Sequence, residues 1–61
     1  MWISIDEAIA MYARFWNARY GAAGIKILHT RAEELRRNGD DEGSQIWSRV
    51  ASEVERHQSR H

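Results

Sequence analysis

Cysteine and proline are both absent from this chain of 61 residues. Without cysteine, disulfides and thiolate metal sites are excluded. A chain this short buries only about 60% of the surface that its unfolded form exposes. Small domains therefore usually add disulfides, a metal, oligomerisation or dense packing. With disulfides excluded, we expect aromatic packing or self-association, and three Trp, two Tyr and one Phe supply the aromatic side chains.

The chain also lacks net charge and any long apolar run. Nine basic and nine acidic residues cancel, so nothing draws it over long range to nucleic acid or to an anionic membrane. No apolar run approaches the ~20 residues that span a bilayer. The segment MWISIDEAIAM is acidic rather than basic and too short for a secretion signal. These features predict a soluble cytoplasmic protein, one domain over residues 1–61, with no membrane association.

Apolar residues recur with the helical period of 3.6, and no strand-like alternation appears. Across RYGAAGIKIL, residues 19–28, a continuous helix would move its apolar stripe by about half a turn. Such a helix could not bury both stripes against one core. We therefore expect a break at Gly21, with Gly24 letting the next helix start close to its neighbour. The alternative is one long helix folded against the last helix in an intertwined dimer.

The predicted fold is all-α. It is a three-helix antiparallel bundle, expected to dimerise, with helices at about residues 5–20, 23–38 and 41–58. Ser4 and Glu7 form a capping box at the first helix, and the Asn-Gly pair at 38–39 suits a left-handed end of the second. Asp40 or Asp41 is the expected cap of the third helix.

The first predicted helix has an apolar arc of roughly 220°, wider than the ~100° typical of a surface helix. Asp6 and Asn17 lie on the opposite side of the helical wheel. Two neighbouring helices cover about half of a helix, so one edge of the arc can fill the core while the other is left for a partner. One edge consists of Ile5, Ile9, Tyr12, Trp16 and Tyr20, and the other of Ala8, Met11, Phe15 and Ala18. Alternatively, all of them fold into a tight aromatic core with ordinary exposed apolar area.

We predict Trp47 as the central core residue, with Gly43, one turn earlier, permitting close approach. The full predicted core is Ile9, Tyr12, Trp16, Leu28, Leu35, Trp47, Val50 and Val54. The predicted docking surface is Trp2, Met11, Phe15 and Ile27. Arg19 projects within the apolar arc and can extend its guanidinium to water at the end of the first helix.

Few residues suggest chemistry. His57 and His61 have the i, i+4 spacing of zinc ligands, with Glu53 one turn earlier, but a solvated helix end explains them as well. The acidic run 40–42 is explained by helix capping and lacks calcium-loop spacing. No serine lies in a glycine-rich turn beside an oriented base. We expect no enzyme activity, no metal and no cofactor.

The second and third helices could imitate a helix-turn-helix. Basic residues occur on both, but acidic residues interrupt them, and the third helix begins with the acids of residues 40–42, whose sign is wrong for phosphates. Nucleic-acid binding is therefore the alternative prediction: a small DNA-binding regulator that uses the third helix.

Three segments, RYGAAG, TRAEEL and NGDDEGSQIWSRVASEVE, resemble a family of short uncharacterised bacterial proteins. The matching positions, within about the last two thirds of the chain, are Gly21, Arg31, Ala32, Gly39, Asp40, Gly43, Trp47, Val50 and Val54. The chain departs from the family at Gly24, where alanine is usual. The resemblance implies a small all-helical domain and brings no activity or catalytic residue.

The sequence therefore predicts a non-catalytic, small helical protein-interaction module: an adaptor, an inhibitor or a regulator. It is expected to form a homo-oligomer through the first helix and to bind a further protein whose identity the sequence leaves open.

Overall fold

The computed structural model describes residues 3–59, which are all-helical and contain no strand. The three helices are α1 (Ile5–Tyr20), α2 (Ala23–Arg37) and α3 (Asp41–Ser59). Each begins and ends within a residue of its predicted bounds. The prediction of an all-α fold with three helices is confirmed.

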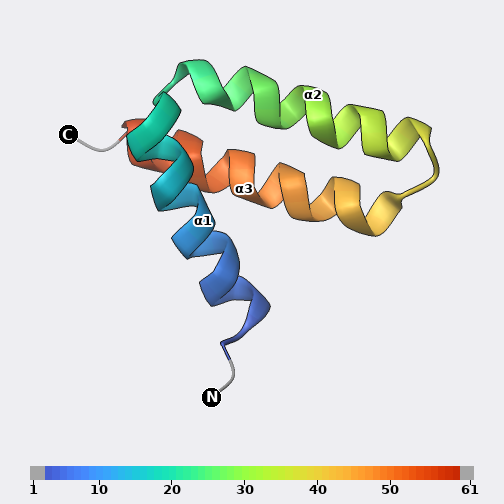
Figure 1. Cartoon of the computed structure of the whole chain (residues 1–61), viewed down its shortest axis with the longest axis horizontal. Helices are drawn as coiled ribbons and strands as arrows, with labels where there is room; N and C mark the ends of the chain where they lie inside the picture. Colours follow the sequence, from blue (N-terminus) through green and yellow to red (C-terminus); the bar gives the residue numbers. More distant parts are fainter. Residues whose placement is uncertain (1–2, 60–61) are drawn as a thin grey trace.

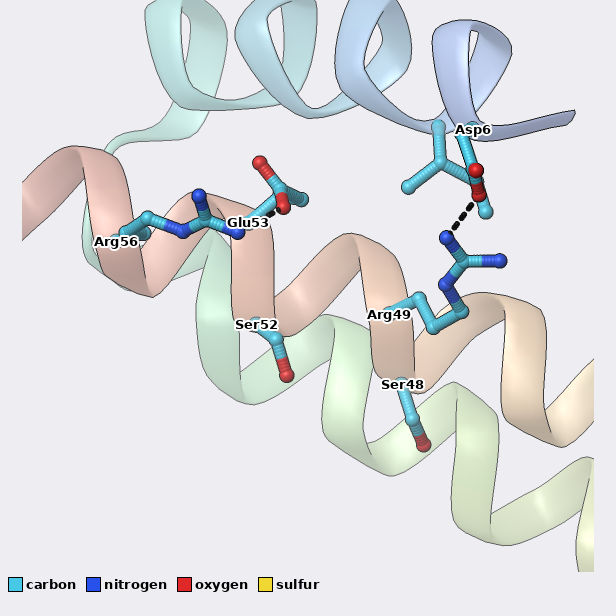
Figure 2. A pocket seen from close by; sticks show the side chains of 7 residues that line it. Asp6, Ser48, Arg49, Ser52, Glu53 and Arg56 are labelled. Carbon is cyan, nitrogen blue, oxygen red and sulfur yellow. Dashed lines mark hydrogen bonds and ion pairs between the residues drawn. The ribbon is translucent and has the colours of Figure 1, made fainter. Parts of the chain in front are cut away.

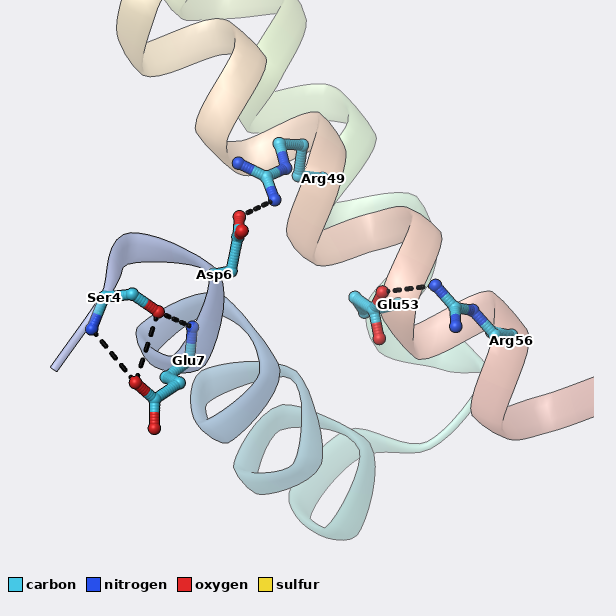
Figure 3. Close-up of polar contacts among 6 residues, drawn as sticks. All are labelled: Ser4, Asp6, Glu7, Arg49, Glu53 and Arg56. Atoms are coloured by element: carbon cyan, nitrogen blue, oxygen red, sulfur yellow. Dashed lines mark hydrogen bonds and ion pairs between the residues drawn. The ribbon is translucent and has the colours of Figure 1, made fainter.

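Helix starts follow local chemistry. The Ser4 hydroxyl accepts from the backbone N–H of Glu7 at 3.1 Å, and the Glu7 carboxylate accepts from the backbone N–H of Ser4 at 3.2 Å (Figure 3). This reciprocal pair is the predicted capping box. Before α3, the Asp40 carboxylate accepts from the backbone N–H of Gly43 at 2.9 Å. Of the two predicted caps, Asp40 therefore takes the role.

The chain turns between α1 and α2, as the shift in the apolar stripe predicted. Gly21 has φ +60° and donates its N–H to the carbonyl of Asn17 at 2.8 Å. A left-handed φ is easy for glycine, which has no Cβ. The alternative of one continuous helix through this segment is wrong. Gly39, with φ +85°, makes the corresponding turn between α2 and α3.

The helices form an open wedge rather than an evenly aligned bundle. In Figure 1, α2 and α3 lie side by side and antiparallel, whereas α1 crosses them steeply. The carboxyl end of α1 meets the start of α2 and the end of α3, and its amino end diverges (Figure 1). Accordingly, α1 contacts α3 more extensively than it contacts α2. The principal extents of 36 × 33 × 16 Å reflect this flat arrangement.

The core is small and rich in alanine. Its buried apolar residues are Ile9, Ala13, Leu28, Ala32, Val50, Ala51 and Val54. Trp16 and Trp47 are partly buried against this cluster, so the prediction of Trp47 as the central core residue is wrong. Leu35 is half-buried and lies outside it. Tyr12, expected in the core, is instead 39% exposed. The alanines let the helix backbones approach closely. The centre of the core is therefore formed by small side chains, and several of the large side chains that we predicted there lie at its edge.

The rotation of α1 about its axis differs from the prediction. Its buried stripe is Ile9 and Ala13, at one limit of the apolar arc. Beside this stripe, Asp6 binds Arg49, and Asn17 accepts a hydrogen bond from the Gln58 amide of α3. The side expected to face solvent thus meets α3 in part. A helix with so wide an apolar arc can bury any of several sectors. The sector that contains the small Ala13 is the one that lets α3 approach the backbone of α1 most closely.

Two glycines make different contacts. Gly24 is buried, and a Cβ there would collide with the indole of Trp16. This is the close approach predicted for Gly24. At Gly43, however, a Cβ would meet the carboxylate of Asp40. Gly43 therefore makes room for the helix cap, and its predicted role beside Trp47 is wrong.

Candidate interaction surface

One side of α1 carries large apolar side chains that no other part of residues 3–59 covers. Ile5 and Phe15 are each 56% exposed, Met11 is 53% exposed, and Tyr12 is 39% exposed. Together with Ala8, these five residues form what we call the exposed seam of α1. Four of them, at positions 5, 8, 12 and 15, follow the alternating spacing of three and four that places side chains on one helical stripe. Met11 widens this stripe by one further position.

An apolar groove adjoins the seam where α1 diverges from α3. It has a volume of about 510 Å³ and opens to solvent. Its lining is predominantly apolar: Ile5, Ala8, Ile9, Tyr12, Ile46, Trp47 and Val50. Ile5, Ala8 and Tyr12 belong to both the groove and the seam. The two features are therefore one continuous apolar surface.

Aromatic rings join α1 to α3 beside the groove. The Tyr12 ring lies 5.8 Å from the Trp16 ring and 5.8 Å from the Trp47 ring, and the latter contact is edge-to-face. Trp16 continues the cluster to Tyr20, with 4.5 Å between centroids. Phe15 lies 6.3 Å from Tyr12. Such contacts hold rings in fixed orientations, so the exposed aromatic side chains belong to an ordered cluster.

Two arginines stand over this cluster. The Arg31 guanidinium lies 6.0 Å from the Trp47 ring centroid, and the Arg19 guanidinium lies 5.9 Å from that of Tyr20. At these distances a cation is attracted by an aromatic face. Arg19, expected to reach water from within the apolar arc, is exposed as predicted. Both arginines add positive charge at the margin of the aromatic cluster.

A second hollow between α1 and α3 is polar. It has a volume of about 460 Å³ and is lined mainly by charged groups and serines. Within it, Asp6 and Arg49 form an ion pair between the two helices, and Arg56 binds Glu53 at 2.6 Å (Figures 2 and 3). The hydroxyls of Ser48 and Ser52 point away from these charged groups (Figure 2). The arrangement joins no serine to a base and acts as a solvated charged surface.

Some charges on the remaining surface are also locally paired. Glu33 accepts from the Nε of Arg36 at 3.2 Å and lies 3.6 Å from Arg37. The hydrogen bond from Arg36 holds the pKa of the Glu33 carboxyl below its ordinary value. His29 lies 3.6 Å from Glu55 on α3. Residues 3–59 contain no group of three His, Asp or Glu side chains placed to hold a metal ion.

The predicted docking residues fall into separate places. Met11 and Phe15 lie together in the exposed seam of α1. Ile27 is 53% exposed on α2, where it borders a hollow of about 420 Å³ with Lys26 and Thr30. Trp2 lies outside the described residues, as does His61 of the metal hypothesis. Of the four predicted docking residues, the structure therefore places only Met11 and Phe15 on one surface.

Sequence reasoning missed the groove. Ile5 and Tyr12 were assigned to the edge of α1 that fills the core, yet both line the open groove. Their heptad-like spacing with Ala8 and Phe15 was the available signal. Ile46 and Trp47 form the opposite wall. No pattern in the sequence indicated that α1 would diverge from α3 and leave this wall open.

No protein-family model, curated protein or solved structure matches this chain. The resemblance to short bacterial proteins stays a prediction. No helix within residues 3–59 is long and apolar enough to cross a membrane.

Proposed function

We propose that this protein is a non-catalytic interaction module that self-associates through the exposed seam of α1. As a small regulator, adaptor or inhibitor, it then acts by binding another protein. The observation that carries the proposal is the exposure of Ile5, Met11 and Phe15, each more than half uncovered, beside an apolar groove.

Size supports an association surface. The half-exposed side chains of the seam offer on the order of 500 Å² of apolar surface, near the upper end for the largest patch on a soluble monomer. The whole described molecule exposes 4839 Å². For so small a chain, covering this patch with a partner also relieves the shortage of core.

The chemistry of the surface supports binding rather than catalysis. Aromatic and methionine side chains are enriched at protein interfaces, where charged residues are depleted from the centre. The seam and groove contain such side chains and no charged group. Two arginines of α3 that could contact phosphates, Arg49 and Arg56, are instead bound to carboxylates. We therefore do not extend the proposal to DNA.

Sedimentation equilibrium over a range of concentrations tests the proposal. Wild type should sediment as a reversible dimer, and Phe15→Glu as a monomer, because a carboxylate within the seam would be desolvated without a partner. Thr30→Glu, an exposed substitution on α2, is the matched control and should dimerise like wild type. If all three proteins are equally stable monomers, self-association is refuted.

A further inference from the structure

We infer that the occupant of the exposed seam is the α1 helix of a second copy, lying antiparallel across a two-fold axis. This inference rests on the proposed function and adds the direction and register of the pairing. Two observations support it: side-chain sizes along the seam and the apolar groove beside it.

Side-chain sizes match in the antiparallel direction. In an antiparallel pair, positions of one helix face positions of the other in reverse order. A register that places Ile5 opposite Phe15 of the second copy also places Ala8 opposite its Tyr12. A small residue then faces a large ring in the two central layers, and an aliphatic side chain faces a ring in the two outer layers. Alternating large and small side chains is how facing helices fill space without voids.

A parallel pair lacks this complementarity, because equivalent residues would face each other. Phe15 would then face Phe15 while Ala8 faced Ala8, which crowds one layer and leaves a void in another.

The groove adds apolar surface for a flank of the second helix. Ile46 and Trp47 form its α3 wall, and Tyr12 lies between this wall and the seam. A helix placed on the seam would therefore meet apolar surface from both α1 and α3. A standard interface buries roughly 800 Å² per partner. The seam supplies on the order of 500 Å² of this, and the groove walls extend the same apolar surface.

Cysteine cross-linking tests the direction, because the natural chain contains no cysteine. In the antiparallel register, the two copies of residue 11 lie beside the two-fold axis. The two copies of residue 18 lie about 24 Å apart along the helices, at 1.5 Å per residue. A disulfide requires Cβ atoms only about 4 Å apart. Mild oxidation of the full chain should therefore convert Met11→Cys to a covalent dimer at least ~10-fold faster than Ala18→Cys.

The outcomes are separable from those of the sedimentation experiment. Faster cross-linking of Met11→Cys supports the antiparallel pairing. Equal or faster cross-linking of Ala18→Cys would overturn it in favour of a parallel pair. If neither variant cross-links while wild type sediments as a dimer, the pairing through α1 in this register is refuted, and self-association stands. If wild type is a monomer, the proposed function and this inference both fail.

Discussion

Gly24 of α2 lies directly against the indole of Trp16 in α1, and a side chain at Gly24 would overlap that ring. The contact fixes how α2 starts beside α1. It also leaves the Trp16 Nε1–H buried and without a hydrogen-bond partner among the described residues. The wedge therefore depends on the absence of one methyl group at its apex.

Gly24→Ala should destabilise the fold. Helix propensity alone favours alanine by about 1 kcal/mol, but overpacking costs about 1–3 kcal/mol, and here the methyl would meet a large ring held by its neighbours. We expect a net loss of roughly 1 kcal/mol in urea unfolding. In a Trp16→Phe background, the smaller ring should accommodate the methyl and reduce the loss. A rise in stability in the natural background would show that the two helices do not touch in this way.

Leu28→Ala should cost about 2–5 kcal/mol, because its side chain is fully buried between the helices. The adjacent Ile27→Ala is the matched control. Ile27 is 53% exposed, so its truncation should cost less than about 1 kcal/mol. Thermal unfolding at one low protein concentration compares the two variants. Equal losses would contradict the orientation of α2.

The Glu33 carboxyl should titrate below its ordinary pKa of 4.5, because Arg36 donates a hydrogen bond to its charged form. Since the folded-state pKa is lowered, the pair stabilises the fold above the unfolded-state pKa. That contribution disappears as the pH falls through the lowered folded value. Carbon-detected NMR titration of wild type and Arg36→Gln checks this. The Glu33 pKa should rise in the variant, and an unchanged value would remove Arg36 as the cause.

Arg14→Glu should leave dimerisation nearly unchanged, because position 14 lies on the side of α1 turned away from the seam. Phe15→Glu, one residue along, places a carboxylate within the seam and should abolish dimerisation. Sedimentation equilibrium gives both affinities. Equal losses in the two variants would show that the interface is not confined to the seam.

The sequence predicted the helices well because local chemistry determines their ends. The capping box at Ser4, the turn glycines at 21 and 39, and the cap at Asp40 each satisfy backbone groups within a few residues. Such signals need no knowledge of tertiary structure. The absence of proline and of strand-like alternation likewise left helices as the only regular element.

The rotation of α1 could not be predicted in the same way. An arc of roughly 220° presents several sectors of similar hydrophobicity, and which of them is buried depends on how closely another helix can approach. The small side chain of Ala13 allowed α3 to approach that sector of α1. With that sector buried, Tyr12 lies at the groove instead of in the core. The exposure of Met11 and Phe15 was foreseen because the arc is wider than its neighbours can cover. The divergence of α1 from α3 depends on packing among Trp16, Trp47 and Gly24, which only the folded arrangement reveals.

Isotope-filtered NOE spectroscopy on a mixture of labelled and unlabelled protein tests most directly whether a second copy covers the exposed seam of α1. We predict intermolecular NOEs between the methyl groups of Ile5 in one copy and the ring of Phe15 in the other, diminishing on dilution. If every NOE to Phe15 arises within one chain at millimolar concentration, the claim is contradicted.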